Sequence, residues 1–194
     1  YQPVVDHQSQ LMGAEALVRW RHPQRGMISP GDFIPLAEQT GLILPLGQYV
    51  LQTACEQLQR RGQHEATAHL SISVNVSARQ FRQPGFVAEV LQTLKNHHAD
   101  PRKLKLELTE SLLLGDIEDT IARMVQLKSE GVGIFLITHD MPDVFGLSDR
   151  LAVMKNGKLV GTYATADVTE DEVLGMVITG KRPEGKPQTE RVAH

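Results

Sequence analysis

Segments with the two-residue period of a strand alternate with segments of helical period over residues 1–140. Residues 69–77 place Leu, Ile and Val on one face and Ser and Asn on the other, and residues 103–109 show a similar alternation of Leu with polar residues. Between them, residues 86–98 carry apolar side chains at helical spacing. This order predicts an α/β protein with parallel strands, in which functional side chains gather at the carboxyl ends of the strands.

The remaining segments of this region fit the same order. Residues 131–140 form an apolar run that stops at Thr138, His139 and Asp140, and we expect a buried parallel strand there. Asp116 is expected to cap a helix. The inner face of that helix is predicted to consist of Ile117, Ile121, Met124 and Val125. Further strands are predicted over residues 1–6 and 13–20, and further helices over residues 30–41 and 47–61.

The C-terminal part has a different pattern. Asn156-Gly157 lies between two strand-like segments and is a strong signal for a two-residue hairpin. Thr169 and Glu172 have the spacing of a capping box, and Gly180 is expected to end the helix that follows. Residues 181–194 are polar and are expected to be loose. The buried face of the helix is predicted to consist of Val173, Leu174, Val177 and Ile178.

The composition excludes several classes of function. The 194 residues are 41% hydrophobic and 22% charged, as in ordinary soluble globular proteins. A net charge of -3 gives no reason to expect binding to nucleic acid. Because no apolar run approaches the roughly 20 residues of a membrane span and the N-terminus is not signal-like, we expect no membrane insertion and a cytoplasmic location. The single Cys55 excludes an internal disulfide and is expected to be a buried, inert thiol.

Three predicted strands carry an oxygen-bearing side chain opposite their aliphatic residues. These side chains are Glu15, Asn75 and Glu107. If they converge, two carboxylates and an amide form a site for a hard cation such as Mg²⁺, Mn²⁺ or Ca²⁺. Arg19 falls on the same face as Glu15 by strand periodicity, so an ion pair within the strand is the alternative interpretation of this pair.

Four motifs carry a resemblance to a known family. They are Tyr1-Gln2-Pro3-Val4-Val5, Glu15-Ala16-Leu17-Val18-Arg19-Trp20, Asn75-Val76-Ser77 and Glu107-Leu108-Thr109-Glu110-Ser111. In this order they resemble the EAL family of bacterial cyclic di-GMP phosphodiesterases. A lone Glu-Ala-Leu would carry no information, whereas the ordered series is highly specific.

The resemblance implies a partial (β/α) TIM-like barrel whose mouth binds two divalent metals and hydrolyses one phosphodiester bond of cyclic di-GMP. Mg²⁺ or Mn²⁺ is the implied cofactor, and Ca²⁺ can occupy such a site without activity. By resemblance, the metal ligands are Glu15, Asn75 and Glu107, the catalytic residues are Glu15, Glu107 and Glu110, and the substrate contacts are Gln2 and Arg19.

The family pattern fails at the end of the apolar run. Where the family continues with Ser-Leu-Asp-Asp, Thr138 and His139 replace the two aspartates. Asp140 comes one position late and is a further candidate metal ligand. The downstream lysine and glutamate of the family are also absent. We therefore expect a truncated or degenerate phosphodiesterase of low or no activity that can still bind metal or cyclic di-GMP.

From Leu136 onward the chain resembles the C-terminal end of an ABC-transporter ATP-binding subunit. The resemblance implies that His139 corresponds to the switch histidine of the H-loop. No Gly-x-x-x-x-Gly-Lys-Ser/Thr motif occurs, so no ATPase activity is expected. We predict an EAL-like half barrel over residues 1–135 and an ABC-ATPase-like strand, helix, hairpin and C-terminal helix over residues 136–194, with the crossover between about 121 and 136. The alternative function is that of a folded chimera without catalysis.

A half barrel poses a problem of closure. Closed barrels of this kind typically need about 250 residues, so the predicted barrel part supplies roughly half. Its edge strands would remain open. The C-terminal part can add strands to the sheet, or two chains can complete each other, and we expect a homodimer.

Overall fold

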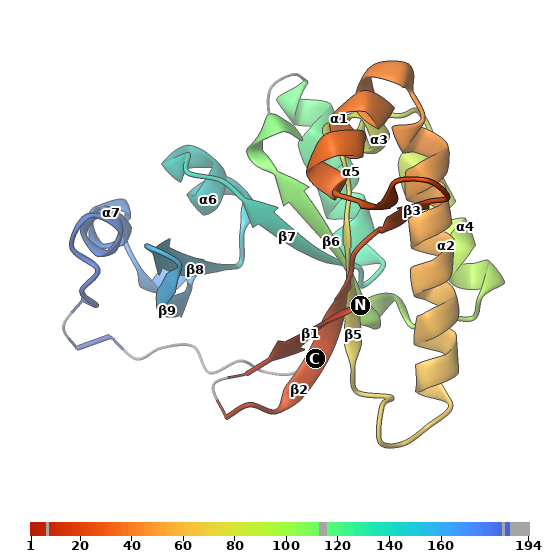
Figure 1. Ribbon diagram of the computed structural model, residues 1–194. Helices are drawn as coiled ribbons and strands as arrows, with labels where there is room; N and C mark the ends of the chain where they lie inside the picture. Colours follow the sequence, from red (N-terminus) through yellow and green to blue (C-terminus); the bar gives the residue numbers. More distant parts are fainter. Residues whose placement is uncertain (7, 113–115, 184, 187–194) are drawn as a thin grey trace. The chain divides into compact units, whose positions relative to one another are not determined.

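The computed structural model describes residues 1–6, 8–112, 116–183 and 185–186, so most of the tail that we expected to be loose lies outside the described residues. The chain divides into two compact units, Tyr1–Ile137 and Thr138–His194 (Figure 1). Each unit has buried apolar residues of its own. No helix in these described ranges is long and apolar enough to cross a membrane.

The first unit is built on a five-stranded sheet with the order β1-β2-β5-β6-β7 (Figure 1). Strands β2, β5, β6 and β7 are parallel, whereas β1 pairs with β2 in the antiparallel direction. The prediction of an α/β protein is thus confirmed, and the expectation of parallel strands is confirmed for all but β1. The strands are β1 Gln2–Val5, β2 Leu11–Ala16, β5 Ser71–Asn75, β6 Leu104–Thr109 and β7 Gly133–Ile137.

The connections between these strands contain the helices of the first unit. A small antiparallel hairpin, β3 with β4, follows β2 and was not predicted. The helices are α1 Pro30–Thr40, α2 Ile43–Gly62, α3 Ala78–Phe81, α4 Phe86–Asn96 and α5 Ile117–Ser129, the 3-10 helices are η1 Pro101–Lys103 and η2 Glu110–Leu112, and the hairpin strands are β3 Trp20–His22 and β4 Gly26–Ile28.

The two faces of the central strands differ in chemistry. On β6, Leu104, Leu106 and Leu108 are fully buried, whereas the alternate residues are polar and more exposed. Strand β5 presents Ile72 and Val74 to the same apolar layer. Helix α2 contacts β5 from this side and also contacts α4 (Figure 1). The opposite face of the sheet is therefore the polar one.

For the first unit, one prediction is wrong and another is right only in part. Strand β2 ends at Ala16, not at Trp20, because its pairing with β5 stops there. Helix α5 begins after the predicted cap, Asp116. Of its predicted inner face Met124 is buried, but the other buried residues are Thr120 and Leu127. This i, i+4, i+7 stripe leaves Ile117 at 45% and Val125 at 59% exposure. Thr120 tolerates burial because its hydroxyl donates to the Asp116 carbonyl oxygen at 2.8 Å.

The expectation that residues 131–140 form a buried strand is also wrong. Strand β7 pairs with β6 and lies at the edge of the sheet as described, with Phe135 52% and Ile137 56% exposed. A strand becomes buried only when neighbours cover it on both sides. Strand β7 therefore has an apolar sequence although its side chains are not fully buried.

The second unit is a hairpin packed on helices. The Asn156-Gly157 turn joins its two strands as predicted. The capping box of Thr169 and Glu172 is confirmed, and Gly180 ends the last helix in a left-handed conformation. The elements are α6 Met141–Leu147, β8 Arg150–Lys155, β9 Lys158–Ala164, η3 Thr165–Asp167 and α7 Glu170–Thr179.

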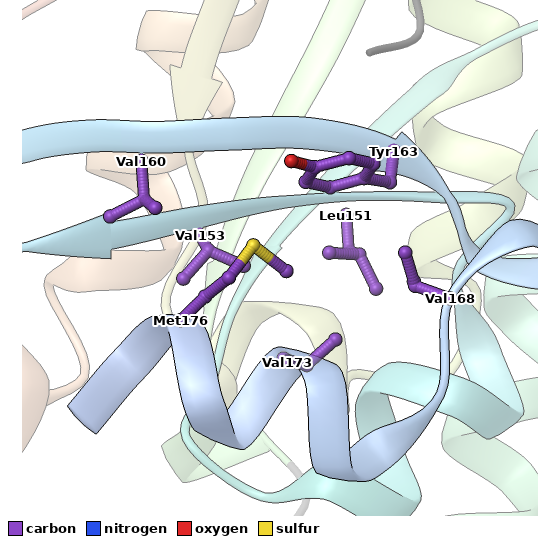
Figure 2. Packing of buried hydrophobic residues seen from close by; sticks show 7 residues of the cluster. All are labelled: Leu151, Val153, Val160, Tyr163, Val168, Val173 and Met176. Carbon is purple, nitrogen blue, oxygen red and sulfur yellow. The ribbon is translucent and has the colours of Figure 1, made fainter. Parts of the chain in front are cut away.

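The core of the second unit lies between the hairpin and α7 (Figure 2). From α7 it receives Val173 and Met176. The predicted inner face is therefore wrong except for Val173, because Leu174, Val177 and Ile178 are 46%, 40% and 63% exposed. The core consists of Leu151, Val153, Val160, Tyr163, Val168, Val173 and Met176.

Candidate functional site

Three strands of the first unit bring the predicted metal ligands to one polar face. Glu15 lies next to the last residue of β2, Asn75 ends β5, and Glu107 lies opposite Asn75 on β6. Residues paired in register on neighbouring strands point to the same face of a sheet. The backbone amide of Val76 donates to the Glu107 carbonyl oxygen at 3.0 Å and extends this alignment beyond the end of β5.

Glu15 and Asn75 are in direct contact. The Asn75 Nδ2 atom donates to Glu15 Oε1 at 2.5 Å. Because the amide donates through its nitrogen, the amide oxygen keeps its lone pairs as a ligand. The hydrogen bond thus fixes the Glu15 carboxylate beside a second oxygen donor.

Glu107 is partly buried, and its pKa lies above the usual value. Burial is the main cause of this raised pKa, and the negative charge of Glu15 raises it further. Ser73 and Lys105 act in the opposite direction, through a hydrogen bond and a positive charge. Because the negative charge of Glu15 disfavours the ionisation of Glu107, a cation bound between them would stabilise the ionised Glu107.

The oxygens of Glu15, Asn75 and Glu107 suit a hard divalent cation, but they supply only part of its coordination shell. Among the residues that the structure describes, no group of three His, Cys, Asp or Glu side chains is placed to hold a metal ion. The site offers two carboxylates and one amide. Mg²⁺ commonly binds through one or two carboxylates and completes its shell with water and substrate oxygens, so this donor set suits it.

The predicted substrate contacts lie on either side of Glu15 in the sequence. Gln2 on β1 is paired directly with Glu15 and is therefore on the same face. Arg19 lies beyond the end of β2, so strand periodicity does not determine its direction. Its Nη1 atom donates to the Val18 carbonyl oxygen at 2.9 Å. Glu15 is hydrogen-bonded to Asn75, and the alternative of an ion pair between Glu15 and Arg19 is not seen.

The other predicted site residues lie outside the strands. Glu110 is exposed and begins η2, directly after β6. His139 and Asp140 belong to the second unit. Asp140 is the N-cap of α6, where its carboxylate accepts from the Asp143 backbone amide at 3.3 Å. A capping role accounts for this carboxylate without a metal.

Sequence reasoning did not single out Ser73 and Lys105, which act on the pKa of Glu107. Both lie on the same face as Glu15, because Ser73 is paired with Glu15 and Lys105 with Ser73. The polar side of the alternating segments was the signal that could have identified them.

Residues 1–139 match the EAL domain family. The bifunctional diguanylate cyclase/cyclic di-GMP phosphodiesterase MucR of Pseudomonas aeruginosa is 44% identical over 137 residues, which cover 69% of this chain and 20% of MucR. The uncharacterized protein Rv1357c of Mycobacterium tuberculosis is 32% identical over 210 residues, covering 99% of this chain and 68% of that protein.

The fold agrees with these relatives. The solved structure described as PaMucR phosphodiesterase in complex with c-di-GMP matches with a TM-score of 0.70 and 38% identity, over 80% of this chain and 64% of that one. The chain spans about a fifth of the length of the first curated relatives. The resemblance of the N-terminal part is confirmed, and the chain belongs to the EAL domain family.

Proposed function

We propose that this chain is a partial EAL-type cyclic di-GMP phosphodiesterase that binds a divalent metal and the dinucleotide, with low or no turnover. The convergence of Glu15, Asn75 and Glu107 on one face carries this proposal. The likeness to MucR, a cyclic di-GMP phosphodiesterase by name, and to its c-di-GMP complex supports the choice of substrate. Mg²⁺ or Mn²⁺ is the proposed cofactor, and Ca²⁺ is proposed to bind without supporting turnover.

Each site residue has a proposed role. Glu15, Asn75 and Glu107 would hold the cation, which when bound lowers the pKa of a coordinated water and neutralises charge on phosphoryl oxygens. Gln2 and Arg19 would contact the substrate, and an arginine suits a phosphate because it can donate two parallel hydrogen bonds. Glu110 would steady a neighbouring loop of the site.

Low turnover is proposed because the residues after β7 differ from the family pattern. By the resemblance to the family, Thr138 and His139 correspond to two acidic metal ligands. A hydroxyl and an imidazole do not supply the negative charge that Mg²⁺ prefers. Asp140 remains a proposed ligand, although its carboxylate caps α6.

The experiment compares the full chain with Glu15→Ala and, as a control, Glu118→Gln on the exposed surface of α5. Hydrolysis of cyclic di-GMP is followed with Mg²⁺ or Mn²⁺, and Mn²⁺ binding is measured by calorimetry. The proposed phosphodiesterase activity is supported if Glu15→Ala abolishes turnover and Glu118→Gln preserves it. If turnover is equal in the parent chain and in Glu15→Ala, or absent from both, the proposal that this chain is an enzyme is refuted. If the two proteins bind Mn²⁺ with equal affinity, the proposed metal site is refuted.

The second candidate is a non-enzymatic chimera of EAL and ABC-ATPase segments. The division of the chain after Ile137 and the end of the family match at residue 139 favour it, whereas the alignment of Rv1357c along 99% of the chain weighs against it. In this proposal His139 corresponds to an H-loop histidine without ATPase activity. The hydrolysis and Mn²⁺-binding measurements together separate the two candidates, because in a chimera neither turnover nor Mn²⁺ affinity depends on Glu15.

We further propose a homodimer in the cytoplasm. The exposed Phe135 and Ile137 on the edge strand β7 support association, because an open apolar strand edge favours pairing with another chain.

A further inference from the structure

The short helix α3 begins three residues after Asn75 and is fixed at its N-terminus. Gln80 and Ser77 form a capping box. The backbone amide of Gln80 donates to Ser77 Oγ at 3.2 Å, and the backbone amide of Ser77 donates to Gln80 Oε1 at 3.3 Å. Gln80 is 8% exposed. It packs so closely on α2 that a Cβ atom at Gly47 would lie 1.5 Å from its Nε2 atom. The position of α3 relative to α2 is therefore narrowly defined.

The other end of α3 is tied to the turn after β6. Arg82, the C-cap of α3, donates from Nη2 to the carbonyl oxygens of Ser111 and Leu112 at 2.8 and 3.1 Å. Both acceptors belong to η2, whose first residue is Glu110. The last carbonyls of a short helix lack partners within the helix, and a guanidinium carries enough donors to satisfy two of them. Leu112 is 1% exposed, so η2 is held by apolar burial as well.

We propose that Arg82 is a positioning residue that holds the turn carrying Glu110 against the strand end carrying Asn75. This inference rests on the proposed function, because it assigns Arg82 to the same site. In this proposal Arg82 acts through the backbone of η2, to which it donates two hydrogen bonds. It links the ends of β5 and β6, the two strands that present Asn75 and Glu107.

Arg123 provides a matched control. Its Nη1 atom donates to the carbonyl oxygens of Phe81 and Gln83 at 2.9 and 2.7 Å, and its Nε atom pairs with Asp119 at 2.7 Å. Arg123 thus binds two carbonyls around the end of α3, as Arg82 does at η2, but it connects α3 to α5. A purely structural role predicts similar consequences for both arginines, whereas a positioning role at η2 predicts different ones.

The experiment compares Arg82→Ala, Arg82→Lys and Arg123→Ala in the full chain by thermal unfolding, hydrogen exchange of residues 109–112, and the affinities for Mn²⁺ and for cyclic di-GMP. In Arg82→Ala we expect faster exchange at residues 109–112 and affinities lower by about tenfold or more, the usual effect of losing a group that orients ligands. Arg82→Lys should give exchange rates and affinities between those of Arg82→Ala and those of the parent chain. Arg123→Ala should lower thermal stability while leaving the affinities and this exchange near those of the parent chain.

Unchanged exchange at residues 109–112 in Arg82→Ala would overturn the proposal. An equal loss of affinity in Arg123→Ala and Arg82→Ala would also overturn it, because the effect would then follow from stability alone. A parent chain that binds neither Mn²⁺ nor cyclic di-GMP contradicts the proposed function and the assignment of Arg82 to its site. The exchange measurement would in that case still show whether Arg82 holds η2.

Discussion

Glu107 lies partly buried on the polar face of β6, where burial and the neighbouring Glu15 raise its pKa. The folded chain therefore holds the Glu107 proton more tightly than the unfolded chain does. The stability linked to this proton is fully present below the pKa of an unperturbed glutamate and is lost as the pH rises through the raised pKa. A bound cation would offset this loss at neutral pH, because it stabilises the ionised carboxylate.

Glu107→Gln tests this linkage. Without metal, the free energy of unfolding of the variant should decline less than that of the parent as the pH rises from about 4 to 7. Mn²⁺ at a hundred times its dissociation constant should stabilise the parent by about 2.7 kcal/mol and the variant by clearly less. Urea unfolding with and without Mn²⁺ measures both effects, with Glu118→Gln as control. Identical pH profiles for Glu107→Gln and the parent would contradict the prediction.

Tyr163 poses a different question at the same scale. It lies in the core of the second unit (Figure 2). Its side chain is 1% exposed, and its hydroxyl has no hydrogen-bond partner among the described residues. An unsatisfied buried hydroxyl costs about 1–3 kcal/mol. We therefore expect Tyr163→Phe to raise the free energy of unfolding of this unit by about 1 kcal/mol, whereas Tyr163→Ala should lower it by about 3–5 kcal/mol. Chemical denaturation followed by circular dichroism tests both, and a loss of stability in Tyr163→Phe would show that the hydroxyl has a partner.

At the scale of elements, the contact between α2 and α3 depends on a glycine, Gly47, which has no side chain. Gln80 occupies the space that a Cβ at Gly47 would need. Gly47→Ala should therefore displace Gln80 and lower the free energy of unfolding by about 1–3 kcal/mol, despite the higher helix propensity of alanine. Gly62, also in α2, is the control, because among the described residues no atom beyond its chain neighbours and the nearby helix backbone lies within 4 Å of its Cβ position. Gly62→Ala should leave the stability unchanged or raise it by up to about 1 kcal/mol. Equal effects of the two substitutions in thermal unfolding would refute this account.

Periodicity and capping signals predicted most elements because they report local structure. The helix after Asp116, the hairpin at Asn156-Gly157 and the capping box at Thr169 all depend on residues close in sequence. The end of β2 at Ala16 could not be predicted, because it depends on where the pairing with β5 stops. For the same reason the buried stripes of α5 and α7 differ from the predicted ones. Which apolar residues of a helix face the core depends on how the helix packs.

The candidate site could be predicted from the sequence only in part. Glu15, Asn75 and Glu107 fall on the polar sides of alternating strands, and the strand register brings them to one face. The roles of Arg82 and Ser73 could not be inferred from periodicity, because hydrogen bonds to a distant turn or carboxylate follow only from the fold.

At the scale of the whole molecule, the exposed edge of β7 predicts self-association. Phe135 and Ile137 are each more than half exposed, on a strand at the edge of the sheet. Light scattering over a rising concentration series should show a mass that increases from monomer to dimer, and Phe135→Lys should shift this transition to higher concentration, since a charge on an edge strand disfavours pairing. The exposed Val125→Lys on α5 serves as control. A strictly monomeric mass at high concentration would exclude the dimer.

The order of the strands in the sheet follows their order in the chain, from β1 to β7. Each new strand is added beside the one that was made before it, so during synthesis the sheet can grow from one side without rearrangement. The connections differ in length, because the one from β2 to β5 contains the β3–β4 hairpin as well as α1 and α2. A parallel pairing across so long a connection is slow to form, since the entropy of closing the loop is lost first. Every strand is then the open edge for the time that the ribosome takes to deliver the next one. Strand β7 is the last in this order, and the exposed Phe135 and Ile137 lie on it.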